Sequence, residues 1–389
     1  MKILKFGGSS IATPENIYQV FTIIQEQLIH NELAVVFSAF GGVTENLLST
    51  AKLAGARDLA YRKELNALAD RHLKLVQQLI SVQHQARVMT FVEVRFKELE
   101  DLFHGIYLIK ENSAKTLDYV ASFGERLSTF ILAEALSGRG LPTTFVDARD
   151  LIRTNNRFGQ ARVDHQKTTV LIKNFFAQHE GTKIITGFIA STENGETTTL
   201  GRSGSDYTAS IFASAVDATA LEIWTDVSGV LTSDPNLVYT AITIPHLTYN
   251  EAMELSHFGA KVIFPATIQP VMKKNIPIYI KNTFEPENKG TLINGDLSQG
   301  GLIKGISSLS EISLVTVQGT GLLEEGAALS RVFKALAESK IKIILISQAS
   351  SEHSICLAIK TEETPLAKEA LEKEFTYEIK SGEMEDVSL

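Results

Sequence analysis

The sequence predicts an α/β protein whose body is an open, mostly parallel sheet covered by helices on both faces. Two segments near the N-terminus predict it: residues 1–6 and the apolar run 33–37 have the composition of strands, and each ends at a glycine turn. A helical pattern follows each turn. Parallel strands need a crossover between them, which is usually a helix, so strands that alternate with helices indicate a parallel sheet.

The remaining elements of this body follow in order along the chain. The first helix should begin after Thr13, a favourable N-cap, with Pro14 at its first position. The polar stretch 58–111 contains no proline and predicts two long helices, which we interpret as an insertion packed on the α/β body. Further strands are expected at 143–146, 183–186, 220–224 and 278–280.

The length of 389 residues corresponds to two or three domains of about 150 residues each. A loop rich in glycine, asparagine, glutamate and serine separates two parts. We assign a first domain to 1–284, a linker to 285–301 and a C-terminal region to 302–389. Within the last region we expect a strand at 302–306, followed by a small βαββα unit with strands at 312–317, 341–347 and 354–360 and helices at 326–339 and 365–375.

Composition excludes several classes of function. Acidic residues outnumber basic ones by 45 to 37, and the net charge of −8 makes nucleic acid an unfavourable partner. Cys356 is the only cysteine, which excludes internal disulfides and cysteine-rich zinc sites, and the histidines lack the spacing of a dedicated metal site. Neither a leader pattern nor a run of about 18 apolar residues occurs, so we expect a soluble, cytoplasmic protein that does not bind membranes.

The turn Gly7-Gly8-Ser9-Ser10 lies between the first strand and the first helix. Glycines there allow backbone N–H groups to approach an anion, and the N-terminus of the helix adds partial positive charge. Lys5 lies close to the same strand end. The P-loop and dinucleotide fingerprints are absent, so a phosphate site here would belong to another fold family. A plain tight turn has the same composition.

Two further segments carry polar groups at predicted helix starts. In 201–206, glycines and hydroxyls surround Arg202, which suits bidentate binding of a carboxylate, and Asp206, which suits an ammonium group or a helix cap. Glu125 is expected in the first turn of a helix that opens at Ser122, where complementing the helix dipole is the simpler role. The segment 224–235 follows a buried strand, at the edge where open parallel sheets bind ligands.

Five segments in this order resemble the aspartokinases of the amino-acid kinase family. They are KFGGSS at 5–10, SFGERLS at 122–128, LGRSGSDYTAS at 200–210, WTDVSGVLTSDP at 224–235 and ELSHFGAK at 254–261. The resemblance covers essentially the whole chain. The C-terminal part is similar to an ACT regulatory domain, most closely the first one of threonine-sensitive bifunctional aspartokinase–homoserine dehydrogenases. It implies an amino-acid-kinase-type open sheet followed by that domain.

The resemblance implies transfer of the γ-phosphoryl group of ATP to the side-chain carboxylate of L-aspartate, which gives 4-phospho-L-aspartate and ADP. This is the first step toward lysine, threonine and methionine. An aspartate carboxylate has a pKa of about 3.9 and is already ionised, so the reaction needs no general base. Catalysis then consists of positioning and positive charge, with Mg²⁺ held mainly by the ATP phosphates and no dedicated metal site in the protein.

The resemblance also assigns roles to individual residues. Catalytic roles fall on Lys5, Gly7, Gly8, Asp206 and Lys261. Substrate binding falls on Ser38, Thr44, Glu125, Arg202 and Ser205. ATP binding falls on Lys5, Gly8, Ser9, Thr225, Asp226, Leu231, Asp234, Lys261 and Val262. Threonine is the expected effector, with Gln348 and Ser354 as its contacts.

The chain departs from the family pattern at four positions. Leu231 replaces an aromatic residue, Asn236 an arginine, and Phe264 and Ala266 a histidine and an arginine. Aspartokinases carry two ACT units, so we expect the regulatory region to be incomplete and the chain to be the kinase portion of a longer bifunctional polypeptide, with a natural short form as the alternative. A homodimer or larger homo-oligomer is expected. Two other functions remain open: a kinase for glutamate or acetylglutamate, and a catalytically silent amino-acid-sensing subunit.

Overall fold

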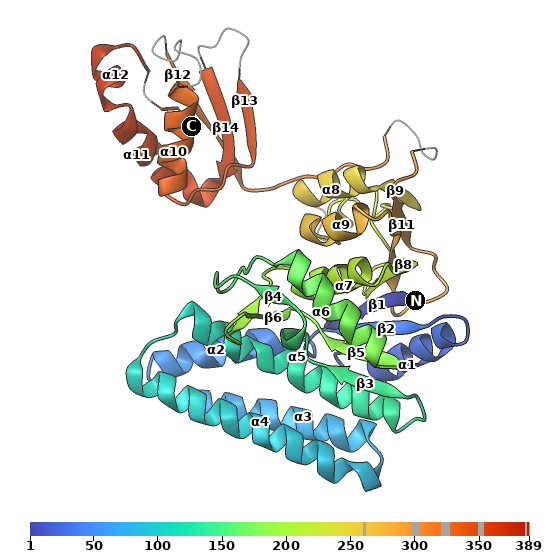
Figure 1. Cartoon of the computed structure of the whole chain (residues 1–389). Helices are drawn as coiled ribbons and strands as arrows, with labels where there is room; N and C mark the ends of the chain where they lie inside the picture. Colours follow the sequence, from blue (N-terminus) through green and yellow to red (C-terminus); the bar gives the residue numbers. More distant parts are fainter. Residues whose placement is uncertain (260–261, 298–302, 320–326, 349–353, 386, 389) are drawn as a thin grey trace. The chain divides into compact units, whose positions relative to one another are not determined.

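The computed structural model describes residues 1–259, 262–297, 303–319, 327–348, 354–385, 387 and 388. The chain divides into two compact units, Met1–Ser307 and Ser308–Leu389 (Figure 1). Among the described residues, the first unit buries two hydrophobic clusters and the second unit buries one. Within the described residues, no helix is both long and apolar enough to cross a membrane.

The first unit is built on an eight-stranded sheet, and the predicted fold class is confirmed. Its strand order is β3-β5-β2-β1-β8-β10-β11-β9, and every neighbouring pair is parallel except β10 with β11. The strands are β1 (Lys2–Phe6), β2 (Leu33–Phe37), β3 (Thr143–Val146), β5 (Thr182–Thr186), β8 (Ala220–Thr225), β9 (His246–Thr248), β10 (Ile278–Asn282) and β11 (Thr291–Asn294). All the strands expected in this unit before residue 300 are present, and β9 and β11 were not expected.

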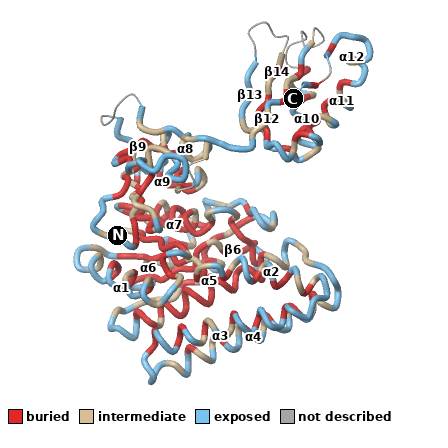
Figure 2. Tube along the Cα trace, turned by 180° about the vertical axis from the view of Figure 1, so that it is seen from behind, coloured by how far each residue is buried: buried red, intermediate tan, exposed pale blue. Residues whose placement is uncertain are grey.

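Successive side chains of the central strands point to opposite faces, each covered by helices. Leu4 and Phe6 of β1 belong to one cluster, which includes residues of α1 (Pro14–Leu28), α2 (Val43–Gly55) and α5 (Ala114–Ser137). Ile3 belongs to the other cluster, with residues of α6 (His165–Gln178), α7 (Gly204–Ala215), α8 (Tyr249–His257) and α9 (Pro265–Met272). Lys5 alternates with Leu4 and Phe6 and therefore faces α7. Figure 2 shows the buried residues concentrated in the sheet and along the helix faces against it.

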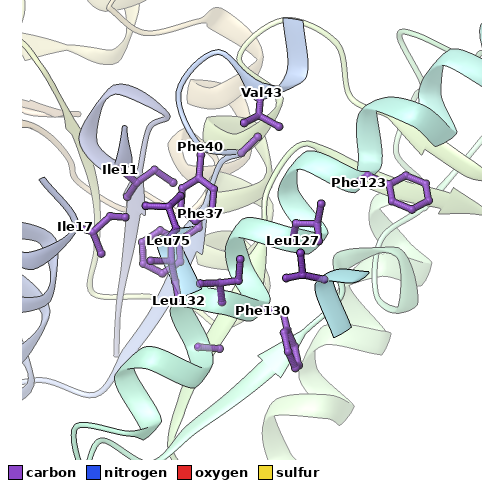
Figure 3. Packing of buried hydrophobic residues seen from close by; sticks show 14 of the residues in the cluster. Ile11, Ile17, Phe37, Phe40, Val43, Leu75, Phe123, Leu127, Phe130 and Leu132 are labelled. Carbon is purple, nitrogen blue, oxygen red and sulfur yellow. The ribbon is translucent and has the colours of Figure 1, made fainter. Parts of the chain in front are cut away.

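The helices predicted in 58–111 are confirmed as α3 (Ala60–Leu79) and α4 (Val82–Ile109). We call this pair the helical hairpin. Its apolar face joins the first cluster through residues such as Leu75, Phe96 and Phe103. Figure 3 shows Leu75 of the hairpin in the same cluster as Phe40, which follows β2, and Leu127 of α5.

Two predictions within the first unit are wrong. Helix α5 begins at Ala114, so Glu125 lies in its middle rather than in a first turn at Ser122. The predicted linker 285–301 contains β11, which pairs with both β10 and β9 of the central sheet.

The segment expected as a strand at 302–306 forms no strand in its described residues, 303–306. Two contacts nevertheless hold this segment against the rest of the first unit. The N–H of Ile306 donates to the carbonyl of Thr232 at 2.8 Å, and Lys304 Nζ lies 2.8 Å from Glu251 Oε2.

A second, small sheet lies beside the main one and was not predicted. It has the order β4-β6-β7, formed by β4 (Arg153–Thr154), β6 (Ile189–Thr192) and β7 (Thr197–Thr199). Short 3₁₀ turns occur at η1 (Ser9–Ile11) and η2 (Ala148–Asp150). The strand β7 leads directly into the segment that carries Arg202 and then into α7.

The second unit has the expected βαββα order. Its antiparallel sheet, β12-β14-β13, packs against helices around Val315, Val332, Leu357 and Phe375. The elements are β12 (Ile312–Gln318), α10 (Ala327–Glu338), β13 (Leu345–Gln348), β14 (Ser354–Lys360), η4 (Thr361–Glu363), α11 (Thr364–Glu374) and α12 (Thr376–Ser381). The second strand begins at Leu345 rather than at residue 341.

Candidate active site

A pocket of about 520 Å³ opens at the carboxyl ends of β1 and β2, beside the start of α7. It brings together segments that lie up to about 200 residues apart in the chain. The predicted site residues that line it are Lys5, Gly8, Ser38, Thr44, Glu125, Arg202, Ser205 and Asp206. Lining residues to which the sequence assigned no role include Phe40, Glu45 and Phe188.

The two turns that follow β1 and β2 pack backbone to backbone. A Cβ atom on Gly8 would lie 3.1 Å from the carbonyl oxygen of Ala39, and one on Gly41 would lie 3.1 Å from the carbonyl oxygen of Gly8. Gly42 has a φ of 79° and serves as the N-cap of α2, a conformation that favours glycine. The glycines are therefore needed for the close approach of the two turns.

Lys5 is almost wholly buried at the end of β1. Its Nζ lies 2.6 Å from Oδ1 of Asp206, which is in the first turn of α7, and this is an ion contact rather than an aligned hydrogen bond. Gly7 leaves room for the ammonium group of Lys5, because a Cβ at residue 7 would lie 3.3 Å from Lys5 Nζ. The pair places one fixed cation beside the glycine turn.

Glu125 is 3% exposed and enters the pocket from the middle of α5. Burial raises the pKa of its carboxyl to about 8, against a smaller opposing effect of a hydrogen bond from the backbone of Ala39. Its Oε2 atom has no partner among the described residues. Gly124 explains how the helix comes so close, because a Cβ there would lie 2.8 Å from Cβ of Ala39. The carboxyl is therefore free to meet a cationic group.

Arg202 lies on the exposed loop between β7 and α7, at the mouth of the pocket. It forms no ion pair with any described residue. Ser203 follows with a φ of 54° and is the N-cap of α7, and Gly204 leaves room for the ring of Phe188 at 2.6 Å from where a Cβ would stand. The local backbone thus fixes the loop while the guanidinium remains available.

Asp118 supports this loop and was missed by the sequence analysis. The buried carboxylate accepts hydrogen bonds from the N–H groups of Gly159 at 2.9 Å and Thr199 at 3.0 Å, and from Thr199 Oγ1 at 2.7 Å. These partners lie 41 and 81 residues away along the chain. No local pattern could have indicated them.

The predicted ATP residues lie mostly outside this pocket. Ser9 is exposed in η1, and Thr225 ends β8, where its hydroxyl donates to Asp226 at 3.1 Å. Leu231 and Asp234 belong to the long loop after β8, and Val262 precedes α9. Because β1 and β8 are parallel neighbours, Ser9 and Thr225 share one edge of the sheet. Lys261 lies outside the described residues.

The metal and effector predictions concern other parts of the chain. Within the part of the chain that the structure describes, no three His, Cys, Asp or Glu residues are grouped so as to hold a metal ion. In the second unit, Gln348 ends β13 and Ser354 begins β14, and the residues between them lie outside the described ones.

The fold is an open α/β sheet with a polar pocket at the carboxyl ends of its strands, beside a buried lysine. The sequence pattern of the amino acid kinase family matches residues 1–282, and that of an ACT domain matches residues 315–375. The chain belongs to the amino acid kinase family, with an ACT domain after the kinase domain.

Known proteins support the same relationship over most of the chain. The chain is 34% identical to the chloroplastic bifunctional aspartokinase/homoserine dehydrogenase 1 of Zea mays, over 99% of this chain and 42% of that protein. It is 32% identical to the lysine-sensitive aspartokinase 3 of Escherichia coli, over 92% of this chain and 78% of that protein. The crystal structure of E. coli aspartokinase III with aspartate and ADP matches with a TM-score of 0.83 and 31% identity, covering 93% of this chain and 79% of that one.

The chain spans less than half the length of the curated bifunctional relatives that it matches.

Proposed function

We propose that this chain is an aspartate kinase, which transfers the γ-phosphoryl group of ATP to the side-chain carboxylate of L-aspartate. One observation carries the proposal: a single pocket joins a fixed lysine, the buried Glu125 carboxyl and the Arg202 guanidinium. Among the described residues, Glu125 Oε2 has no hydrogen-bond partner and Arg202 forms no ion pair. The last two groups complement the ammonium and the carboxylate of a free amino acid. The similarity to an aspartokinase crystallised with aspartate and ADP supports the same choice of substrates.

The chemistry suits the charges of the pocket. The attacking carboxylate is ionised at neutral pH, so the obstacle is repulsion between two anions rather than removal of a proton. Lys5 Nζ and the backbone N–H group of Gly8 stabilise the charge on the transferring phosphoryl group. The N–H of Gly7, which the sequence also assigned to catalysis, donates instead to the carbonyl oxygen of Trp224 at 3.3 Å. Asp206 holds the lysine in place through the 2.6 Å contact.

The substrate is held by groups of both charges. Arg202 binds the α-carboxylate of aspartate through its two parallel N–H groups. Glu125 and Asp206 bind the ammonium group. The hydroxyls of Ser38, Thr44 and Ser205 donate hydrogen bonds to the reacting carboxylate and orient it.

The nucleotide lies along the neighbouring edge of the sheet. Its binding residues are Ser9, Thr225, Asp226, Leu231, Asp234, Lys261 and Val262. Bound Mg²⁺ shields the negative charge of the phosphates. The phosphates themselves would supply most of the ligands of this ion.

Regulation and assembly extend the proposal. Threonine acts as the feedback effector through the ACT domain, with Gln348 and Ser354 at its site, and the chain works as a homodimer or larger assembly. The product is the first intermediate of the aspartate-derived amino acids. The reaction takes place in the cytoplasm.

A coupled assay of ADP release tests the proposed activity. With Mg-ATP, L-aspartate should support turnover, whereas glutamate and N-acetylglutamate should support little. Release of ADP with another acid instead of aspartate would assign a different substrate. Absence of ADP release with every acid would favour a catalytically silent amino-acid-sensing subunit.

Two substitutions test the assigned roles in this assay. Lys5→Met should lower kcat by about 100-fold or more and change the aspartate KM less, because the lysine acts on the transferring group. Arg202→Ala should raise the aspartate KM by about tenfold or more, since it removes a charged hydrogen-bonding partner of the substrate. Lys63→Met and Arg162→Ala, at exposed positions outside the pocket, are the matched controls. Normal turnover of Lys5→Met, or unchanged aspartate saturation in Arg202→Ala, would reject the corresponding role.

A further inference from the structure

Arg71 of the helical hairpin reaches the two glycine turns of the pocket at once. Its Nη1 donates to the carbonyl oxygen of Gly41 at 2.8 Å, and its Nη2 donates to the carbonyl oxygen of Ala12 at 3.3 Å. Gly41 belongs to the turn after β2, and Ala12 closes the turn after β1. One planar guanidinium therefore connects the ends of two neighbouring strands.

The two turns come so close at Gly41 that the second turn has no room for a side chain there. A Cβ on Gly41 would lie 3.0 Å from Cβ of Ala12 and 3.1 Å from the carbonyl oxygen of Gly8. The backbone of Gly41 therefore packs on the methyl group of Ala12 and the backbone of Gly8, and the guanidinium supplies directional hydrogen bonds to both turns. A rigid fork of donors holds two acceptors at a fixed distance better than a flexible ammonium group does.

His72, the next residue of α3, packs against the turn after β2. His72 is fully buried, and its ring lies 5.6 Å from the ring of Phe40, which lines the pocket. Its Nδ1 is 2.7 Å from the carbonyl oxygen of Leu68, and burial lowers its pKa to about 4, so the ring is neutral at physiological pH. Arg71 and His72 together make the hairpin a support for the turn that carries Ser38 and Thr44.

We propose that Arg71 is a positioning residue for phosphoryl transfer. It sets the separation between the turn that holds the transferring phosphoryl group, at Gly7 and Gly8, and the turn that holds the aspartate, at Ser38 and Thr44. This inference rests on the proposed function. In-line transfer requires the reacting atoms within about 3–3.5 Å, and a misplacement of about 1 Å costs about 100-fold in rate. The helical insertion therefore contributes to catalysis although no residue of it lines the pocket.

Kinetics of Arg71→Met and Arg71→Lys test the rate effect in the full chain. Arg71→Met should lower kcat by about 10- to 100-fold, while the KM values for ATP and aspartate change by less than about threefold, because each turn keeps its own contacts with its substrate. The kcat of Arg71→Lys should lie between those of the wild type and Arg71→Met, since an ammonium group reaches one of the two carbonyl oxygens more readily than both. Arg62→Met, an exposed position on the same helix, is the matched control and should behave like the wild type.

Hydrogen exchange tests the connection itself without reference to the reaction. In Arg71→Met, the amides of 7–12 and of 38–44 should both lose protection, while those of β1 and β2 should not. Unchanged exchange in the two turns would overturn the inference, and so would a rise in aspartate KM with an unaltered kcat. If the wild type releases no ADP with aspartate, the proposed function fails, and the exchange measurement still decides whether Arg71 joins the turns. Should Arg71→Met not fold, Arg71→Lys carries both measurements.

Discussion

Folding raises the pKa of the Glu125 carboxyl, and this change bears on the proposed role of the residue. Its carboxyl is buried beside the turn after β2, and desolvation raises its pKa to about 8. In the unfolded chain the same group titrates near 4.5. Between these values the folded protein holds a proton that the unfolded chain has lost.

This difference predicts how stability depends on pH. Because the folded state binds more protons than the unfolded state in this range, the contribution of Glu125 is fully present below about pH 4.5 and is lost as pH rises through about 8. Urea unfolding at a series of pH values should show the decline in the wild type and a flatter profile in Glu125→Gln. Glu111→Gln, at an exposed position, should keep the wild-type profile.

The same measurement connects the residue to its proposed ligand. An ammonium group beside Glu125 favours the ionised carboxylate, so saturating aspartate should reduce the decline of stability between pH 5 and 8 in the wild type. Aspartate should have no such effect on the slope in Glu125→Gln. If aspartate left the pH dependence of stability unchanged in the wild type as well as in Glu125→Gln, Glu125 would not bind the ammonium group.

At the scale of elements, helix α5 serves both sides of the pocket. It carries Glu125 into the pocket and, two turns earlier, Asp118, which anchors β7 just before the Arg202 loop. Three donors converge on the buried Asp118 carboxylate. The helix therefore fixes the two ends of the proposed aspartate site relative to each other.

Asp118→Asn tests this role, because it keeps the shape of the side chain but replaces one acceptor oxygen with a donor. The amide oxygen can still accept from the N–H groups of Gly159 and Thr199 while its NH2 group donates to the Thr199 hydroxyl, so the change mainly removes the negative charge that strengthens these bonds. We expect a loss of about 1–3 kcal/mol in the free energy of unfolding, together with a higher aspartate KM and a nearly unchanged ATP KM. Urea unfolding and substrate saturation measure the two effects. Asp101→Asn, on the exposed side of α4, is the control, and wild-type stability in Asp118→Asn would contradict the role.

The elements that the sequence predicts well are those whose signal is local. The apolar runs that form β2 and β8, and the capped start of α1 at Thr13, can be recognised within a few residues. The strands β4, β6 and β7 were missed because they are two to four residues long and rich in threonine and serine, without an apolar alternation.

Within the site, the same distinction separates residues found from residues missed. Lys5, Glu125 and Arg202 lie in motifs with an unusual local composition. Asp118 and Arg71 act through partners 30 to 81 residues away, and only the tertiary fold brings those partners close. Glu125 was placed wrongly in its helix because Ser122 and Gly124 resemble a helix start, whereas Gly124 is required by the contact of α5 with Ala39.

At the scale of the whole molecule, the boundary between the units follows the sheet rather than the composition of the loop. The strand β11 lies between β10 and β9, and β9 has no other strand partner among the described residues. Beyond it, Lys304 pairs with Glu251, whose other bond closes the capping box of α8. Residues up to 307 are therefore part of the first unit.

Two truncations test this boundary. A chain of residues 1–307 retains the complete sheet and should fold and release ADP with aspartate. A chain of residues 1–284 lacks β11, which exposes the edge of β10 and leaves β9 unpaired, so it should be less stable and prone to aggregate. Thermal unfolding and size-exclusion chromatography compare the two. Equal stability would place the boundary back at residue 284.

The proposed effector response requires the ACT domain, because Gln348 and Ser354 lie in that domain. Threonine should lower the rate of ADP release by the full chain, and lysine should lower it less. The 1–307 chain should keep its activity and respond to neither amino acid, since it lacks Gln348 and Ser354. A full response to lysine with a flat threonine titration would assign lysine as the effector. A threonine response that persists in 1–307 would place the effector site in the catalytic unit.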